Sequence, residues 1–216
     1  MINMQNVTFR YSKRSPILLK DLSLTIEQGS SVALLGRSGS GKTTLSRLLL
    51  GLIKPTEGNI IIKGEVATKA SKGVGQLVHQ YPESSLNSKR SIVESVEEPL
   101  LRLGLSRIER VRQVREMLLD VGLDESFLYR HPHQLSGGQL QRVCIARALV
   151  AKPAFVVLDE VVNRLDVQTK VTLLDLLREL RHSHQLTYLF VTHDVTSAKY
   201  TCDTIYKLEN GAIQLQ

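Results

Sequence analysis

Hydrophobic and polar positions in the first quarter of the chain predict strands followed by a helix. Residues 4–11 alternate between apolar and polar side chains, as in a half-buried strand, and a second strand-like stretch covers 22–26. Residues 31–36, SVALLG, form a continuous apolar run, which is typical of a strand buried on both faces in a parallel sheet. The leucines of 44–52, TLSRLLLGL, recur on one helical face. The pattern therefore predicts a strand, a glycine-rich turn and a helix, in that order.

The middle of the chain, from about residue 85 to 150, is predicted to be helical. Apolar side chains recur there at spacings of three and four, with Arg and Glu on the opposite face: Ile108, Val111, Val114, Leu118 and Val121. Helix-breaking residues divide the region into short helices: Pro99, Gly104, Gly122 and Pro132.

The last third of the chain alternates between strand and helix patterns. A strand is predicted for 154–159, a helix for 167–181 and a strand for 187–194, followed by a short helix and a hairpin around Gly211. Such alternation predicts a mainly parallel sheet, and the edge strands near both termini are expected to pair antiparallel. We expect one α/β domain spanning 1–216.

The composition is that of a globular protein, with 42% hydrophobic and 23% charged residues. No apolar run is long enough to cross a bilayer, and residues 1–14 lack a signal-peptide apolar segment, so we expect a cytoplasmic chain that reaches a membrane only through partners. Cys144 and Cys202 form no metal-binding pattern and are expected to be structural. The net charge is +7, but the Lys and Arg residues are scattered over helical faces, which disfavours nucleic acid as a partner. Attraction to phosphorylated ligands and acidic lipid surfaces explains the positive charge equally well.

The glycine-rich turn GRSGSGKT, residues 36–43, matches G-x-x-x-x-G-K-[ST] between a predicted strand and a predicted helix. Its glycines permit backbone angles that aim consecutive amide groups at one point, where phosphates can lie on the helix N-terminus. Lys42 would reach the β and γ phosphates, and Thr43 would ligate Mg²⁺. This setting favours a nucleotide site over an ordinary glycine turn. The expected nucleotide-binding residues of the turn are Gly36, Arg37, Ser38, Gly39, Ser40, Gly41, Lys42, Thr43 and Thr44.

Acidic residues follow the predicted strand 154–159. Asp159 would lie at the C-terminal end of that strand, where ligands of parallel sheets collect, and would hold Mg²⁺ directly or through water. Glu160 would then be free to orient an attacking water. Alone, such a pair is more often only the solvated end of a strand.

The stretch LSGGQLQRVCIARAL, residues 135–149, is the most specific in the chain. Ser136, Gly137 and Gly138 would present a hydroxyl and bare amide groups at the start of a helix, which makes a second anion-binding surface. One chain with one nucleotide hardly needs two such surfaces. Two chains packed head to tail would use both, each covering the other's γ-phosphate.

In the content and order of these motifs, essentially the whole chain resembles the ATP-binding subunits of ABC transporters. The resemblance implies a P-loop NTPase fold of the ABC type, with a mainly parallel core sheet, an N-terminal antiparallel β-subdomain and a helical signature subdomain at about 85–150. It also implies ATP and Mg²⁺ as ligands. Tyr11 would stack on the adenine, and Thr43, Gln80 and Asp159 would bind Mg²⁺. The implied catalytic residues are Gln80, Glu160 as the general base and His193 as the switch residue. The residues implied to contact the partner's nucleotide are those of the signature and the D-loop: Ser136, Gly137, Gly138, Gln139 and Asp166. Taken singly, the Tyr, Gln and His have ordinary structural explanations.

Finer features are similar to the peptide and nickel importer branch, most of all to its nickel-import ATPases: SSLN after Gln80, EEPL at 97–100 and HPHQLSGGQ at 131–139. The resemblance implies an ATP-hydrolysing subunit, peripheral at the cytoplasmic face of the cell membrane, that energises import of nickel, a metal chelate or an oligopeptide. The implied partners are a second ATPase subunit, identical or not, two transmembrane permease subunits and an extracytoplasmic solute-binding protein. The histidine pairs at 131–133 and 182–184 supply too few ligands for a nickel site of their own.

The chain departs from this family at three places. Asn163 and Arg164 stand where relatives carry Ser-Ala or Ser-Asn, which is expected to tune contacts with the partner subunit. The interval 58–80 is shorter, which predicts the loss of one hairpin. The chain stops soon after Gly211, so no regulatory or metal-cluster role of a C-terminal extension is expected.

Two other functions stay open at the level of sequence. One is a soluble ABC ATPase that acts on nucleic acid or the ribosome, although such proteins usually carry two cassettes or long coiled-coil insertions. The other is a nucleotide clamp without hydrolysis, against which the presence of both Glu160 and His193 argues.

Overall fold

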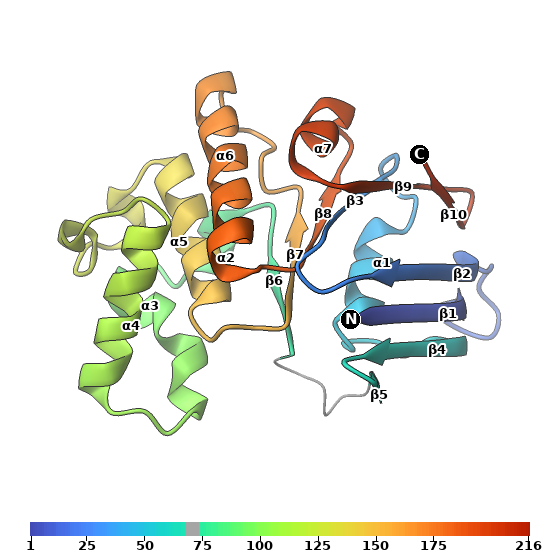
Figure 1. Cartoon of the computed structure of the whole chain (residues 1–216), viewed down its shortest axis with the longest axis horizontal. Helices are drawn as coiled ribbons and strands as arrows, with labels where there is room; N and C mark the ends of the chain where they lie inside the picture. The colour runs from blue at the N-terminus through green and yellow to red at the C-terminus, as the bar shows by residue number, and fades with distance from the viewer. Residues whose placement is uncertain (68–73) are drawn as a thin grey trace.

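The larger of two β-sheets forms the centre of the protein. The computed structural model describes residues 1–67 and 74–216, and in this part the larger sheet has the strand order β10-β9-β3-β8-β7-β6 (Figure 1). Its strands are β3 (Ser31–Leu35), β6 (Gly75–Val78), β7 (Phe155–Asp159), β8 (Tyr188–Thr192), β9 (Thr204–Glu209) and β10 (Ala212–Leu215). All neighbours pair in parallel except β9 and β10, which pair antiparallel as predicted for the C-terminal edge.

The central strands are apolar throughout because both faces of the sheet are covered. In β7, Val156 and Leu158 belong to the core formed with the helices between β6 and β8, whereas Val157 belongs to the core on the other face. Because both faces are covered, β7 has no polar face. For the same reason the continuous apolar runs of the sequence coincide with the parallel strands.

A smaller antiparallel sheet packs on the second face, in the order β2-β1-β4-β5. Its strands are β1 (Ile2–Phe9), β2 (Leu19–Ile26), β4 (Glu57–Ile62) and β5 (Glu65–Val66). The predicted antiparallel N-terminal part is therefore confirmed, and β2 begins three residues earlier than the sequence pattern indicated. The predicted shortening between 58 and 80 falls partly on 68–73, which lie outside the described residues.

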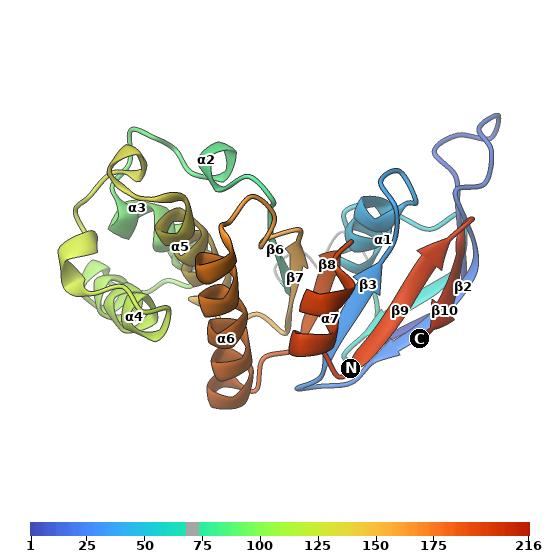
Figure 2. The same cartoon turned by 90° about the horizontal axis from the view of Figure 1, so that it is seen from above.

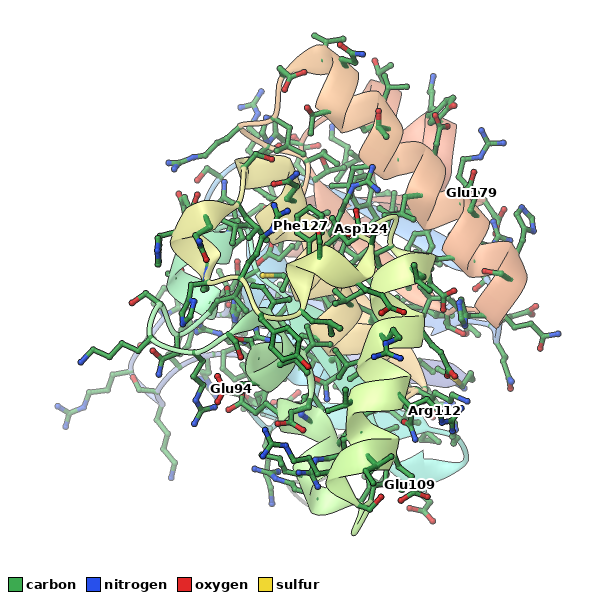
Figure 3. All side chains as sticks on the ribbon, turned by 90° about the vertical axis from the view of Figure 1, so that its left-hand side faces the viewer. Glu94, Glu109, Arg112, Asp124, Phe127 and Glu179 are labelled. Atoms are coloured by element: carbon green, nitrogen blue, oxygen red, sulfur yellow. The ribbon has the colours of Figure 1, made fainter. Side chains whose placement is uncertain are left out.

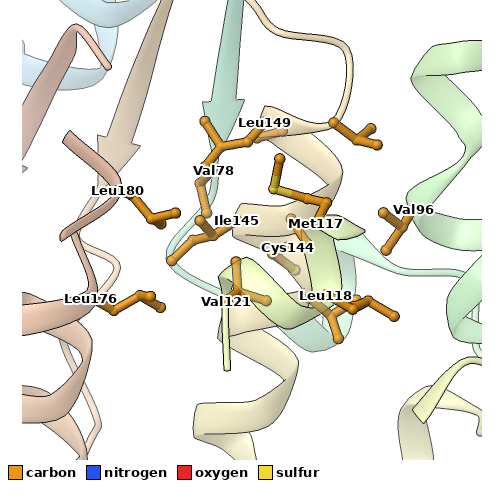
Figure 4. Close-up of a cluster of buried hydrophobic side chains, with 14 of the residues drawn as sticks. Val78, Val96, Met117, Leu118, Val121, Cys144, Ile145, Leu149, Leu176 and Leu180 are labelled. Carbon is orange, nitrogen blue, oxygen red and sulfur yellow. The ribbon is translucent and has the colours of Figure 1, made fainter. Parts of the chain in front are cut away.

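The region between β6 and β7 is helical, as predicted. Its elements are α2 (Pro82–Ser85), α3 (Ile92–Val96), α4 (Arg107–Asp120) and α5 (Gly137–Leu149), with 3-10 turns at Glu98–Arg102, Glu125–Phe127 and Pro132–Gln134. Figure 4 shows Cys144, Ile145 and Leu149 of α5 surrounded by apolar side chains from α3, α4 and α6. In α4 the predicted apolar face begins late, because Ile108 in the first turn is 83% exposed whereas Val114 is fully buried.

Capping boxes set the starts of the longer helices in this region. At α4, Ser106 Oγ accepts a hydrogen bond from the Glu109 amide at 3.3 Å, and the Glu109 carboxylate accepts one from the Ser106 amide at 3.0 Å. Ser91 and Glu94 form the same arrangement at α3. The labelled Glu94 and Glu109 lie on the charged outer surface of the helical region in Figure 3.

Of the remaining helices, α6 (Val167–His184) and α7 (Val195–Thr201) connect strands of the larger sheet, and α1 (Lys42–Leu49) leads from β3 to β4 of the smaller sheet. Figures 1 and 2 place the helical region and the smaller sheet on opposite sides of β3, β7 and β8. Because these three strands are parallel, the loops that follow them meet at one edge of the sheet. Among the described helices, none combines the length and the apolar character needed to span a bilayer.

Candidate nucleotide site

The loop between β3 and α1 has the backbone shape that the glycine pattern predicts. Gly39 and Gly41 have φ values of 79° and 104°, in the left-handed region that favours glycine. A Cβ atom on Gly36 would lie 2.6 Å from Ser40 Oγ and 2.8 Å from the Leu208 carbonyl oxygen. No side chain caps the N-terminus of α1, so its first amide groups point toward the loop without a side-chain acceptor. The loop is therefore a cradle of backbone donors.

Lys42 and Ser40 carry the polar side chains of this cradle. The buried Lys42 Nζ donates to the carbonyl oxygens of Gly36 at 2.8 Å and Arg37 at 3.1 Å, so the ammonium group is held by the loop itself. Among the described residues, the buried Ser40 Oγ has no hydrogen-bond partner. A buried hydroxyl without a partner is unfavourable, and a phosphate oxygen in the loop would provide the missing acceptor.

Asp159, at the end of β7, is half-buried beside another carboxylate. Its burial, and then the neighbouring charge of Glu160, raise the pKa of Asp159 above its usual value. A cation near this carboxylate would relieve both effects. Thr43 is exposed at the start of α1, and its side chain is accessible from solvent.

The Glu160 carboxylate joins residues from several segments. Its Oε2 accepts hydrogen bonds from Gln80 Nε2 at 3.0 Å and from Asn163 Nδ2 at 2.6 Å. Its Oε1 lies 3.9 Å from Lys42 Nζ and 3.8 Å from His193 Nδ1. The backbone of Glu160 has φ of 53°, in the left-handed region, directly after the end of β7. The structure thus brings together the loops that follow β3, β6, β7 and β8.

Tyr11 lies beside the start of α1 with its ring largely accessible. The side chain is 61% exposed, packs edge-on against Phe9, and shares a hydrogen bond with Thr44 Oγ1 at 2.8 Å. An exposed aromatic face next to the phosphate loop is open to a planar ligand.

The signature segment LSGGQ, residues 135–139, has a structural role at the start of α5. Ser136 Oγ accepts from the Gln139 amide at 3.4 Å, and Gln139 Oε1 accepts from the Ser136 amide at 3.0 Å, which completes a capping box. Asp166 in turn caps α6, and the hydrogen bonds from Thr169 hold the pKa of Asp166 below its usual value. Neither Ser136 nor Asp166 hydrogen-bonds to the Lys42–Glu160 group in the described part of the chain.

The residue pattern gave no indication of an ion pair beside His193. Asp194 caps α7, and its carboxylate pairs with Lys170 of α6 and accepts from Ser197 Oγ at 2.6 Å. Burial raises the pKa of Asp194, but the contacts with Lys170 and Ser197 outweigh it and hold the pKa at about 2. The Asp-Val-Thr-Ser run is a recognisable N-cap signal, whereas the lysine comes from 24 residues earlier in the chain.

A phosphate cradle and carboxylates at the C-terminal edge of a parallel sheet define a P-loop ATPase. The profile of the ABC transporter family matches residues 19–163. The chain is 41% identical over 204 residues to the nickel import ATP-binding proteins NikE of Escherichia coli (strain K12) and Shigella dysenteriae serotype 1 (strain Sd197), covering 91% of this chain and 76% of each relative. The chain therefore belongs to the ABC transporter family, as an ATP-binding subunit that hydrolyses ATP.

Solved structures agree with this assignment. The ATP-binding cassette MJ0796, a dimer in a post-hydrolysis state bound to ADP and Pi, superposes with a TM-score of 0.87 at 31% identity, covering 100% of this chain and 98% of that chain. The cbiO1 protein of Clostridium perfringens, part of the ABC transporter complex cbiONQ, has a TM-score of 0.92 at 28% identity, covering 100% and 87%. The ABC-type fold with its antiparallel N-terminal sheet is confirmed.

Proposed function

We propose that this single cassette is the ATPase subunit of an importer, lies at the cytoplasmic face of the membrane, and uses Glu160 as the base that activates water. The observation that carries the proposal is the Glu160 carboxylate, held at Oε2 by two amide groups while Oε1 faces Lys42 and His193. Oε1 is thus the oxygen left to accept a proton from water, beside the loop that would hold the γ-phosphate. His193 is 62% exposed, so its imidazole can turn toward that phosphate.

The residues present fit a Mg²⁺ ion with the nucleotide. Burial and the neighbouring Glu160 charge raise the pKa of Asp159, so a nearby cation would stabilise its anionic form. Thr43 lies in the first turn of α1, and Gln80 follows β6. A bound Mg²⁺ would neutralise charge on the phosphates. The chain's own part is to position phosphates and water, since in phosphoryl transfer most catalysis comes from positioning and electrostatic stabilisation. Tyr11 would stack on the adenine.

We further propose that the signature residues Ser136, Gly137, Gly138 and Gln139, together with Asp166, serve the nucleotide of a partner ATPase. They make no hydrogen bond to the chain's own candidate site within the described residues, and the similar MJ0796 cassette is a dimer. A head-to-tail pair would place the N-terminus of α5, a ready anion site, over the partner's phosphates. The partner ATPase can be a second copy or a paralogue.

The contact with the permease subunits is proposed at the segment around Gln80 and Tyr81. Tyr81 is 41% exposed there, and a surface hollow lies between Gln80, Ser84 and Arg147. This segment also donates to the Glu160 carboxylate, so a displacement by the permeases would reach the proposed base directly. A soluble ATPase acting on nucleic acid is the competing proposal, but no observation in the structure favours it.

Nickel is the proposed cargo, on the strength of the NikE relatives alone. Among the described residues, no group of three or more His, Cys, Asp and Glu side chains is placed to hold a metal ion. His131 stacks on His133 with ring centroids 5.8 Å apart, and His184 pairs with Asp120 at 3.1 Å. Selection of the cargo would belong to the solute-binding protein and the permeases.

The proposal is tested with Glu160→Gln in the complex with its permeases. We expect ATP binding to persist and turnover to fall by about 10²- to 10⁴-fold, because a general base contributes about that much. Glu179→Gln, an exposed glutamate on α6 labelled in Figure 3, is the matched control and should keep full activity. Normal turnover by Glu160→Gln would disprove the base assignment. Stimulation by nucleic acid and not by permeases would favour the competing proposal.

A further inference from the structure

The two residues that depart from the family pattern both turn back toward the chain's own site. Asn163 Nδ2 donates to Glu160 Oε2 at 2.6 Å, and the Asn163 amide donates to the Glu160 carbonyl oxygen at 3.1 Å. The guanidinium of Arg164 lies 4.4 Å from the centre of the Tyr81 ring and within 3.4 Å of its hydroxyl oxygen. Arg164 therefore fastens the loop after β7 to the segment after Gln80.

These contacts decide which oxygen of Glu160 is free. Both amide donors, from Gln80 and Asn163, bind Oε2, whereas the basic groups of Lys42 and His193 approach Oε1. A rotation that tilted the carboxylate out of its present plane would break both amide hydrogen bonds at once. The carboxylate is therefore fixed in one orientation.

Of the two amide donors, Asn163 is the one whose hydrogen bond to Glu160 does not depend on the position of another segment. Gln80 comes from the end of another strand, and its proposed roles at the metal and at the permeases require its segment to move. Asn163 lies three residues after Glu160 in the same turn, closed by a backbone hydrogen bond and flanked by the buried Val161 and Val162. Its contact with Glu160 therefore persists when the Gln80 segment moves.

We propose that Asn163 is a positioning residue for the Glu160 carboxylate, holding Oε2 so that Oε1 receives the proton of the attacking water. The inference rests on the proposed role of Glu160 as base. It assigns to Asn163 an intrachain function beside the contact with the partner subunit that is expected from the sequence.

The test compares ATP turnover of the assembled complex carrying Asn163→Leu, which removes the donor but keeps the branched side-chain shape, and Asn163→Asp, which keeps the shape and adds a second carboxylate. For Asn163→Leu we expect kcat to fall by about 10- to 100-fold with KM for ATP within about twofold, since misplacing a catalytic group costs rate and not ground-state binding. For Asn163→Asp we expect the acid limb of the kcat profile to move to higher pH, because two adjacent carboxylates do not both ionise readily.

The controls separate this inference from the function on which it rests. Asn59→Leu removes an exposed amide on β4, outside the residues assigned to the site, and should leave kcat unchanged. In a Glu160→Gln background, Asn163→Leu should cause no further loss. If Glu160→Gln is inactive while both Asn163 variants keep the wild-type kcat and pH profile, the positioning role is refuted and the base assignment stands. If Glu160→Gln turns over normally, both are refuted.

Discussion

The ion pair beside the proposed switch histidine allows a quantitative prediction. Asp194 follows His193 directly, caps α7, and pairs with Lys170 of α6. Asp194→Asn keeps the capping oxygen, because Asn and Asp are equivalent N-caps, but removes the charge. The substitution therefore isolates the electrostatic part of the contact that holds the end of β8 against α6.

The magnitude follows from the pKa of Asp194, which the contacts with Lys170 and Ser197 lower from 3.8 to about 2 in spite of burial. At about 1.36 kcal/mol per pH unit, this shift corresponds to at most about 2.4 kcal/mol of stability. The Asp194 and Lys170 side chains keep 24% and 30% of their exposure, so solvent screening reduces the expected effect to about 1 kcal/mol. Because the folded-state pKa is lowered, this stability is present above pH 4 and is lost as the pH falls toward 2.

The assay is urea unfolding of wild type and Asp194→Asn between pH 7 and pH 3. We expect the variant to be less stable by about 1 kcal/mol at pH 7, and the difference to fall to about half near pH 3. Glu209→Gln, which removes the carboxylate of the surface pair with Lys207, is the control and should have little effect. Equal stability at pH 7, or a difference that stays constant with pH, would refute the reasoning.

Two further predictions concern buried ionisable groups. Asp159→Asn should stabilise the nucleotide-free protein in thermal unfolding, and the gain should grow as the pH rises above about 4, because the raised pKa of Asp159 makes the folded state favour its protonated form. The same variant should lose Mg²⁺-dependent ATP binding. A less stable variant would contradict this account. Burial raises the pKa of Cys144 to about 11 and that of Cys202 to about 12, so both thiols should react with a thiol reagent at pH 8 only on unfolding; rapid labelling of the native protein would show that one of them is accessible.

The sequence predicted the parts of the fold that depend on burial. A continuous apolar run predicts a strand covered on both faces, and β3, β7 and β8 are such strands. The apolar periodicity was less informative where one end of a helix extends beyond the core. It indicates which residues share a face of the helix, but not which part of that face is buried. Ile108 fits the apolar repeat of α4 but extends into solvent.

The phosphate loop was predictable because its function lies in the backbone. Its shape depends on glycines at fixed spacing, and Gly39 and Gly41 adopt the left-handed angles that the pattern requires. Side-chain pairings across the site were not predictable in the same way. The hydrogen bond from Asn163 to Glu160 depends on the left-handed backbone of Glu160, and the pairing of Lys170 with Asp194 depends on how α6 packs beside α7. The catalytic and ligand-binding roles of the site residues, Tyr11 and Asp166 among them, stay predictions.

The adjacent carboxylates Asp159 and Glu160 are distinguished by their surroundings and not by their chemistry. Asp159 still lies in β7, half-buried, and burial together with the neighbouring Glu160 charge raises its pKa, so a cation beside it would stabilise its anion. Glu160 leaves the strand at φ of 53°, and its carboxylate accepts hydrogen bonds from Gln80 and Asn163. The same backbone turn that ends β7 therefore separates the proposed metal-binding position from the proposed proton-accepting one. Because the Asn163 side chain binds the Glu160 carboxylate within that turn, we expect a substitution of Asn163 to impair the proposed role of Glu160 more than it impairs folding.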